Sequence, residues 1–309
     1  MVEHIGNVTI EYNEKNWVSD KDNYHECEKG DDVLEFAEME KIAGGDIYES
    51  VINDSRWPVL YHFSNMRKSI LEWFDFSSEA TLLEVGADCG ALTELYCQKV
   101  KKVVGIDTSY KRLKVNAIRN SQYDNLELVA CDIQNYDSDE KFDYITLIGV
   151  LEYADYLFDC DGADSKFISK LKELLKPGGK IIIAVRNKYG LKYWAGATDE
   201  YSGEMFDTIK GENALAKAYS LNNIKSVLEN EGLNKLTFYY PLPDYIIPTE
   251  IFSDDFLPKS GDMHDIHNSF KHERYNLFSE AKAYESICKD GLFPQFANSY
   301  LIISEMEND

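Results

Sequence analysis

Hydrophobic positions in the middle of the chain form short apolar runs that alternate with longer amphipathic stretches. The runs are rich in β-branched residues, whereas the stretches between them repeat their apolar positions at helical spacing. This alternation predicts right-handed β-α-β units and a buried parallel sheet. The runs expected to form its strands are residues 81–85, 102–107, 126–132, 142–150 and 180–185.

The same periodicity predicts helices before the first strand and one helix before the last of these strands. We expect helices at 33–41 and 57–74, and we expect residues 1–32, which are polar and aperiodic, to be irregular. Residues 167–179 predict a helix that ends at Pro177, because proline cannot continue a helix and the two glycines after it permit a reversal.

The C-terminal half is less regular. Ser220 is expected to cap a helix that stops at Gly232, and two further strands are expected at 236–243 and 298–306. The connection between these strands is far longer than a hairpin needs and contains a predicted helix at 279–289. Insertions of this size at a sheet edge are typical of lids or binding loops.

Together these elements predict one doubly wound, Rossmann-like α/β domain. We expect a mostly parallel sheet with an antiparallel last strand and helices on both faces. The domain is expected to span 76–309, with lid insertions at about 187–218 and 244–293. Residues 1–75 are expected to form an N-terminal extension whose helices pack on the core.

Composition narrows the choice of partners. The chain of 309 residues is 44% hydrophobic and 28% charged, which is ordinary for a globular protein. Its net charge of −23 would repel nucleic acid and anionic lipid headgroups. No apolar run approaches the ~20 residues that span a bilayer, and the N-terminus lacks the pattern of a secretory signal. We therefore expect a cytoplasmic protein that binds neither nucleic acid nor membrane; the sequence predicts no oligomeric state.

No metal site is predicted. The six cysteines lack the CxxC spacing of a zinc site. The only histidine cluster, His264, His267 and His272, lies in a polar, loop-like segment and is expected to be solvated surface.

Candidate chemistry begins at the glycine-bearing turn after the first strand of the sheet. A dinucleotide fingerprint needs glycine at the positions held by Asp88 and Ala91, and a carboxylate beside a pyrophosphate would be a like-charge clash. S-adenosylmethionine instead carries a sulfonium and an ammonium, which suit Glu84 and Asp88. Gly86 and Gly90 would let this ligand approach the backbone closely. The charges of Glu84 and Asp88 therefore favour S-adenosylmethionine over a dinucleotide as the ligand.

The ends of the next strands carry matching side chains. Asp107 stands about 20 positions after Gly86, where an acid can accept both ribose hydroxyls. Asp132 would accept from the adenine amino group while Ile133 packs on the ring, although Asp132 can also be only a turn former. Gly149, after the fourth strand, would lie under the reactive methyl.

These motifs resemble the class I S-adenosylmethionine-dependent methyltransferases. The resemblance rests on LLEVGADCGALTELY, VVGIDTS, ACDI and KPGGKIIIAV, and it covers roughly residues 80–186. It implies that Glu84 and the glycines hold the methionine part of the donor, that Asp107 holds the ribose and that Asp132 reads adenine. The family usually has glycine where Asp88 stands.

A second resemblance concerns the C-terminal half. RNKYGLKYWAGATDEYSGEMFD and YYPLPDYIIPTEIFSDDFLP resemble methyltransferases found alongside bacterial glycosyltransferases and surface-polysaccharide enzymes. The aromatic residues of the first segment would form an acceptor pocket or pack as a lid.

The predicted function is methyl transfer from S-adenosylmethionine to a hydroxyl or amine of a small molecule or glycan. Glu152 and Tyr153 are the catalytic candidates, although both residue types are also common at a helix start. Arg67 is a candidate partner of the donor's carboxylate, with a surface arginine as the alternative. Two other functions stay open: a non-catalytic nucleoside-binding module and a nicotinamide oxidoreductase on the same fold.

Overall fold

The computed structural model describes residues 1–12, 34–211, 215–265 and 274–306. These residues form two compact units. Unit 1 consists of Met1–Leu147 and Lys170–Ile181, and unit 2 consists of Ile148–Ser169 and Ile182–Asp309.

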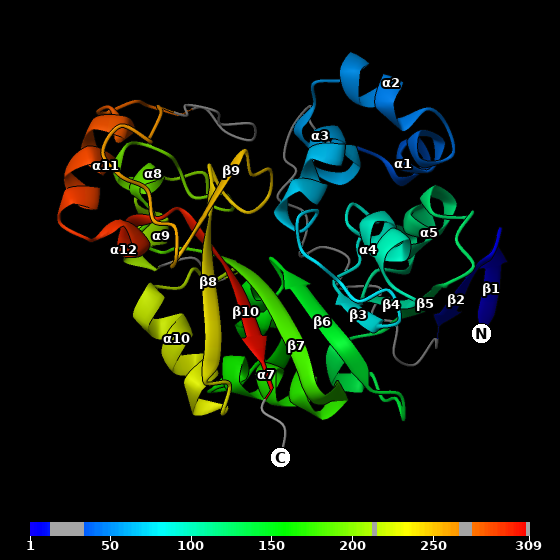
Figure 1. Ribbon diagram of the computed structural model, residues 1–309. Coiled ribbons are helices and arrows are strands. Elements are labelled where there is room, and N and C mark those ends of the chain that lie inside the picture. Colours follow the sequence, from blue (N-terminus) through cyan, green and yellow to red (C-terminus); the bar gives the residue numbers. More distant parts are fainter. Residues whose placement is uncertain (13–33, 212–214, 266–273, 307–309) are drawn as a thin grey trace. The chain divides into compact units, whose positions relative to one another are not determined.

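Unit 1 is built on a mostly parallel sheet with the strand order β1-β2-β5-β4-β3-β6, followed by the first residues of β7 (Figure 1). Every pairing from β2 to β6 is parallel, and only the β1–β2 pairing is antiparallel. The strands are β1 (Val2–Ile5), β2 (Val8–Tyr12), β3 (Thr81–Val85), β4 (Lys102–Asp107), β5 (Leu126–Ala130), β6 (Phe142–Ile148) and β7 (Leu175–Arg186).

The chain order of these strands reverses direction at β3, because β4 lies on one side of it and β6 on the other. Open α/β sheets bind ligands outside the carboxyl ends of the strands at such a switch point. The turn after β3 therefore occupies the position where this fold binds a nucleotide or nucleoside.

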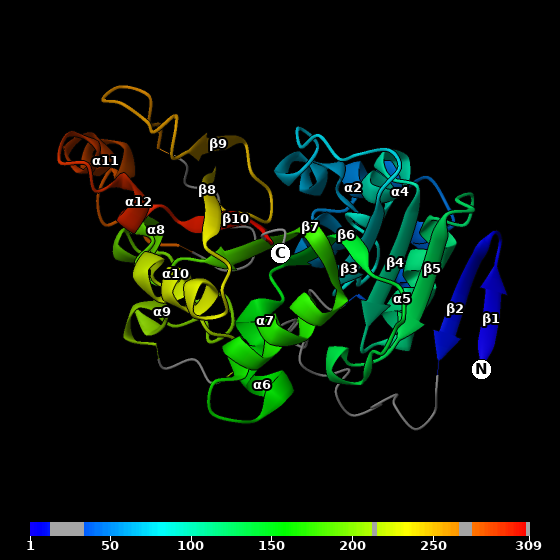
Figure 2. The ribbon, with the colours of Figure 1, turned by 60° about the horizontal axis from the view of Figure 1, so that its bottom comes forward.

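Helices cover this sheet and the turn after β3. Helix α5 contacts β2, β4 and β5, and α4 contacts β4 (Figure 2). Helices α1 and α3 join α5 through an apolar cluster that includes Met39, Phe63, Cys89 and Val115. The helices of unit 1 are α1 (Phe36–Ala43), α2 (Ile47–Asn53), α3 (Trp57–Phe63), α4 (Thr93–Lys99) and α5 (Tyr110–Arg119), with 3₁₀ helices η3 (Asn65–Ile70) and η4 (Ile133–Asn135).

The expectation of an irregular N-terminus is wrong for residues 1–12. They form a hairpin, and β2 pairs in parallel with β5. Val8 and Ile10 alternate with polar residues and are fully buried, which is the pattern of a half-buried strand. The tight turn between the strands uses Gly6, whose φ is +58°. Residues 13–33 lie outside the described part of the chain.

The helix predicted over 57–74 is broken in the structure. Helix α3 ends at Phe63, and Ser64 adopts an extended conformation before η3 begins. The Ser64 hydroxyl accepts from the backbone amide of Met66, so it caps the second helix instead of continuing the first.

Unit 2 continues from β7 in the strand order β7-β10-β8-β9, and both β10–β8 and β8–β9 are antiparallel. Ser220 caps α10 by accepting from the backbone amide of Asn223, and Gly232 follows the helix with φ +77°, so the predicted start and stop are confirmed. The elements are η5 (Leu151–Tyr153), α6 (Ala154–Phe158), α8 (Leu191–Trp194), α9 (Asp207–Lys210), α10 (Leu221–Asn230), β8 (Lys235–Leu242), β9 (Glu250–Ser253), α11 (Glu280–Lys289), α12 (Phe293–Phe296) and β10 (Ser299–Glu305).

The helix predicted over 167–179 ends earlier than expected. Helix α7 (Ala163–Leu174) stops three residues before Pro177, and β7 already begins at Leu175. The proline disfavours a helical conformation for the residue before it and has no amide to donate, so the KPGG segment becomes the first part of the strand.

The predicted fold class is confirmed by this mostly parallel sheet with antiparallel C-terminal strands. In the described part of the chain, no helix is long and apolar enough to cross a membrane.

Candidate functional site

The turn after β3 is shaped by three residues with left-handed backbone conformation. Gly86, Asp88 and Gly90 have φ values of +77°, +45° and +80°. A Cβ atom at Gly90 would lie 2.7 Å from the Asn116 side-chain oxygen, so no larger residue fits there without displacement. The backbone amides of Gly86 and Ala87 both donate to the Ile106 carbonyl and fix the turn against β4.

Glu84 is buried near the end of β3. Its Oε2 accepts from the Thr93 hydroxyl at 2.6 Å. The Thr93 oxygen in turn accepts from Asn116 Nδ2 at 2.9 Å, and the same amide donates to the Ala87 carbonyl at 3.1 Å. Burial raises the pKa of Glu84 to about 8, against the opposing Thr93 hydrogen bond, and the nearby carboxylates of Asp88 and Asp107 raise it further.

Asp107 ends β4 and is also buried. One carboxylate oxygen accepts from the backbone amide of Asp88 at 3.0 Å, and the other accepts from the amide of Ser109 at 2.9 Å. Burial raises the pKa of Asp107 to about 6, and the Asp88 carboxylate adds to this effect. Each carboxylate oxygen has more than one acceptor position, so the group can still accept hydroxyl protons from a ribose.

The side chain of Asp88, which is predicted to pair with the donor's cations, contacts an arginine and a histidine of unit 1. Its Oδ1 accepts from Arg112 Nη1 at 2.7 Å, and its Oδ2 lies 3.0 Å from His62 Nδ1. Although burial alone would lower the pKa of His62, the adjacent Asp88 carboxylate raises it well above its ordinary value. The carboxylate of Asp88 therefore has cationic or titratable partners inside unit 1. Its pairing with the donor's cations stays a prediction.

Asp132 and Ile133 follow β5, and both are buried. One oxygen of Asp132 accepts from the backbone amide of Gln134 at 3.0 Å and caps η4. The turn-forming role that the sequence left open is thus present, and the reading of adenine stays a prediction.

Two arginines of unit 1 are buried and form no ion pair with a carboxylate of the described residues. Arg67, on η3, is 5% exposed and stacks on the Tyr61 ring at 4.3 Å. Arg119, at the end of α5, is 7% exposed, and its Nη1 donates to the His62 carbonyl at 2.8 Å while its Nε has no partner. Burial lowers the pKa of Arg119 and the neighbouring Arg67 charge lowers it further, whereas the carboxylates of Glu94 and Glu84 oppose this shift without forming an ion pair. Neither guanidinium forms an ion pair with any of the described residues, and a buried charge without an ion pair is costly.

The remaining predicted residues belong to unit 2. Gly149 follows β6 with φ +79°, and a Cβ atom there would lie 2.7 Å from the Tyr245 hydroxyl. Only glycine therefore fits at this position. The role of Gly149 under a reactive methyl stays a prediction.

Glu152 is 1% exposed and is held by Arg186. Its two oxygens accept from the backbone amide and from Nε of Arg186 at 2.6 and 2.7 Å. Burial raises the pKa of Glu152, against the opposing charge and hydrogen bonds of Arg186. Both carboxylate oxygens are engaged by Arg186, and the catalytic role of Glu152 stays a prediction. The Tyr153 hydroxyl lies 2.6 Å from the hydroxyl of Tyr201.

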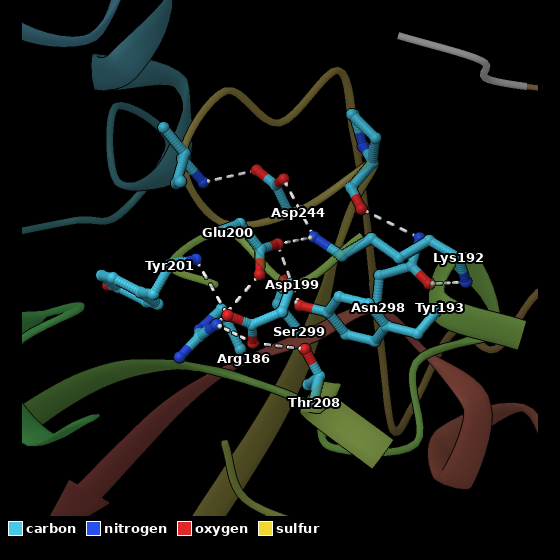
Figure 3. Close-up of polar contacts among 12 residues, drawn as sticks. Arg186, Lys192, Tyr193, Asp199, Glu200, Tyr201, Thr208, Asp244, Asn298 and Ser299 are labelled. Atoms are coloured by element: carbon cyan, nitrogen blue, oxygen red, sulfur yellow. Dashed lines mark hydrogen bonds and ion pairs between the residues drawn. The ribbon is translucent and has the colours of Figure 1, made fainter. Parts of the chain in front are cut away.

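Besides Glu152, Arg186 contacts a larger polar network in unit 2. Figure 3 shows Arg186 together with Lys192, Glu200 and Asp244 of this network. Glu200 receives hydrogen bonds from Arg186 at 2.9 Å and from Lys192 at 2.8 Å. Lys192 also lies 3.4 Å from Asp244. This network joins the two segments that the sequence predicted as insertions, because Lys192 and Glu200 come from the first and Asp244 from the second.

One group of possible metal ligands occurs among the described residues. Donor atoms of His62, Asp88 and Cys89 lie within 4.8 Å of one another. Arg112 already donates to Asp88 from 2.7 Å, and its charge opposes a cation there. His264 is exposed, and His267 and His272 lie outside the described residues.

Sequence reasoning missed His62, Thr93, Arg112, Asn116 and Arg119. Only α5 offered a signal: Arg112 and Asn116 stand four residues apart and Arg119 three residues later, so these polar residues share one helical face. All three turn out to be buried against the turn and α3.

Comparison with known families now bears on this geometry. Residues 83–181 match the family described as "Methyltransferase domain". The segment that resembles this family is less than half of the chain. The match includes Glu84, the turn after β3, Asp107 and Asp132. It agrees with the class of enzyme that the sequence predicts for this segment.

Several curated proteins are similar to parts of the chain. Mouse mitochondrial ubiquinone biosynthesis O-methyltransferase is 28% identical over 176 residues, which are 53% of this chain and 45% of that protein. Nodulation protein S of Bradyrhizobium diazoefficiens is 28% identical over 92 residues, 30% of this chain and 44% of that protein. The chain thus spans less than half the length of these relatives.

Solved structures also resemble the chain. The N-methyltransferase NodS from Bradyrhizobium japonicum WM9 aligns at a TM-score of 0.45 and 15% identity, covering 78% of this chain and 94% of that one. Phosphoethanolamine N-methyltransferase 1 of Haemonchus contortus aligns at a TM-score of 0.48 and 11% identity, covering 89% of this chain and 50% of that one.

Proposed function

We propose that this protein transfers a methyl group from S-adenosylmethionine to a hydroxyl or amine of a small molecule or glycan. The donor binds to unit 1 at the turn after β3. The observation that carries this proposal is the hydrogen-bond network that joins Glu84 at the end of β3, Asp107 at the end of β4 and the backbone of the turn between them.

The donor's nucleoside and amino groups fit the acids of this network. Asp107 has free acceptor positions for the ribose hydroxyls. Glu84, buried and close to the turn, offers a carboxyl group that a donor ammonium would stabilise in its ionised form. Asp132 is the proposed partner of adenine, with Ile133 packing on the ring.

The donor's carboxylate fits the two unpaired arginines. A buried guanidinium without a counter-ion is costly, and a bound carboxylate would remove that cost. We therefore assign Arg67, and with it Arg119, to the carboxylate of the methionine part.

When bound, S-adenosylmethionine supplies a methyl group already activated by a positively charged sulfur. The contribution of the protein is then to hold donor and acceptor in an aligned geometry. Because Arg186 engages both oxygens of Glu152, we assign Glu152 to positioning and keep Tyr153, paired with Tyr201, as the candidate contact with the acceptor.

The choice of acceptor is supported by the relatives' names and by the residues of unit 2. One relative is named as an O-methyltransferase of ubiquinone biosynthesis, and a similar structure is named as an N-methyltransferase. Tyr189, Trp194 and Phe206, about two-fifths exposed, offer aromatic faces for a sugar or another small acceptor.

Asp107→Asn tests the donor site. The substitution keeps the shape of the side chain but removes the charge and one acceptor oxygen. We expect the affinity for S-adenosylhomocysteine, measured by calorimetry, to fall by about tenfold or more, which corresponds to about 1.4 kcal/mol. Unchanged affinity in a variant that unfolds like the wild type would reject the assignment of Asp107.

A further inference from the structure

Asp88 combines a strained backbone with an anchored side chain. Its φ of +45° lies in the left-handed region, which non-glycine residues rarely adopt and which costs roughly 1–2 kcal/mol. The family that this chain resembles usually has glycine here. A residue that pays this cost must be held by its side chain or backbone contacts.

The contacts that hold Asp88 come from two different helices. Arg112 of α5 donates to one carboxylate oxygen at 2.7 Å, and His62 of α3 lies 3.0 Å from the other. The side chains of Arg112 and His62 are 7% and 2% exposed, so both contacts are shielded from water. Charge-assisted hydrogen bonds in such surroundings are strong and directional.

The backbone of the same residue reaches the ribose-binding acid. The Asp88 amide donates to Asp107 at 3.0 Å, and the Asp88 carbonyl accepts from Asn116 at 3.4 Å. The orientation of this amide depends on the left-handed conformation of the turn. The contacts of the Asp88 side chain therefore hold in place the backbone amide that orients Asp107.

We propose that His62 and Arg112 are positioning residues for the methyl donor, acting through Asp88. They hold the turn after β3 in the conformation that presents Asp107 to the ribose. In consequence α3, which precedes the matched methyltransferase domain in the sequence, contributes to donor binding without touching the donor. This inference rests on the proposed donor site.

The test compares Asp88→Gly, Asp88→Asn and His62→Gln with the wild type. Asp88→Gly relieves the backbone strain and also removes the side-chain contacts with Arg112 and His62. Its effect on the affinity for S-adenosylhomocysteine therefore differs according to which of the two matters. If only backbone geometry matters, glycine leaves the affinity for S-adenosylhomocysteine unchanged or improves it. If the anchor positions Asp107, the dissociation constant rises by about tenfold or more.

Asp88→Asn retains the tolerance for a left-handed conformation but loses the charge, and we expect it to bind more tightly than Asp88→Gly. This partial rescue is a readout that general destabilisation would not give.

Asp143→Asn is the matched control. Asp143, at the amino end of β6, pairs with Lys176 at 2.7 Å and accepts from the backbone amide of Thr81 at 2.7 Å. Like Asp88 it pairs with a basic side chain of unit 1, but it lies at the opposite end of the strands. We expect it to lower the melting temperature without changing donor-product affinity.

The outcomes separate the two hypotheses. Binding by the wild type together with weakened binding by the Asp88 and His62 variants supports the inference. Equal binding by wild type and Asp88→Gly overturns the inference but leaves the donor site standing. If the wild type itself does not bind S-adenosylhomocysteine, the proposed function and the inference both fail.

Discussion

At the scale of single residues, the proposed donor site contains two buried acids, and burial disfavours their charged forms. The pKa of Glu84 is raised to about 8 and that of Asp107 to about 6, so near neutral pH Glu84 is mostly protonated in the ligand-free protein. The sequence predicted both positions, because each acid ends a strand of a parallel sheet. It did not predict their protonation, which depends on packing by residues distant in the chain.

A pH dependence of donor binding follows from Glu84. A cationic ammonium near this carboxyl would lower its pKa, so binding releases a proton below about pH 8. We expect affinity for S-adenosylhomocysteine to rise as pH increases from 6.5 to 8, by up to about tenfold per pH unit, and then to level off.

Calorimetry in buffers of different ionisation enthalpy counts the proton released. Glu84→Gln should abolish both the release and the rise in affinity over this range. A wild-type affinity that is flat between pH 6.5 and 8, with no proton released, would contradict the role of Glu84.

The partners of Asp88 show where prediction from sequence ends. His62 and Arg112 stand 26 and 24 positions away from it. No local pattern connects these positions, since they meet only when α3 and α5 pack against the turn. The sequence therefore predicted an acid beside the donor, whereas the structure shows an acid whose two carboxylate oxygens contact Arg112 and His62.

At the scale of elements, the central strands β3 and β4 were predictable to the residue, whereas the N-terminal hairpin and the start of β7 were not. The run 102–107 is continuous and apolar, and it forms β4 with the predicted bounds. The N-terminal hairpin was missed because its alternating pattern covers only residues 1–12 beside a long polar stretch. The start of β7 was missed because Pro177 was interpreted as the end of a helix. A proline also disfavours a helical conformation for the residue before it, so the helix ends earlier.

Gly90 offers a test of how tightly α5 packs on the turn after β3. Gly90→Ala places a methyl group about where the Asn116 amide lies and adds the cost of a left-handed alanine. We expect the free energy of unfolding to fall by roughly 2–4 kcal/mol, measured by denaturant titration.

Gly162→Ala is the matched control for this substitution. Gly162 has φ +72°, and a Cβ atom there has nothing within 4 Å. It should therefore lose only about 1–2 kcal/mol, the cost of the conformation alone. Equal losses in the two variants would show that α5 does not constrain the turn.

At the scale of the whole molecule, charge is distributed very unevenly. The chain carries a net charge of −23, yet Arg67, Arg112 and Arg119 are all buried in unit 1 around the turn and α3. The overall acidity predicted the absence of polyanion partners, which stays a prediction, as does the cytoplasmic location. The site itself combines acids with unpaired arginines, and this mixture suits a zwitterionic nucleoside.

The central claim is that unit 1 binds the methyl donor and not a dinucleotide. A thermal-shift titration of the wild-type protein with S-adenosylhomocysteine and, in parallel, with NADH tests this claim directly. At a ligand concentration of about 100 times the dissociation constant, binding stabilises the folded state by about 2.7 kcal/mol. We predict a concentration-dependent rise in melting temperature with S-adenosylhomocysteine and none with NADH. A rise with NADH alone, or with neither ligand, would contradict the account.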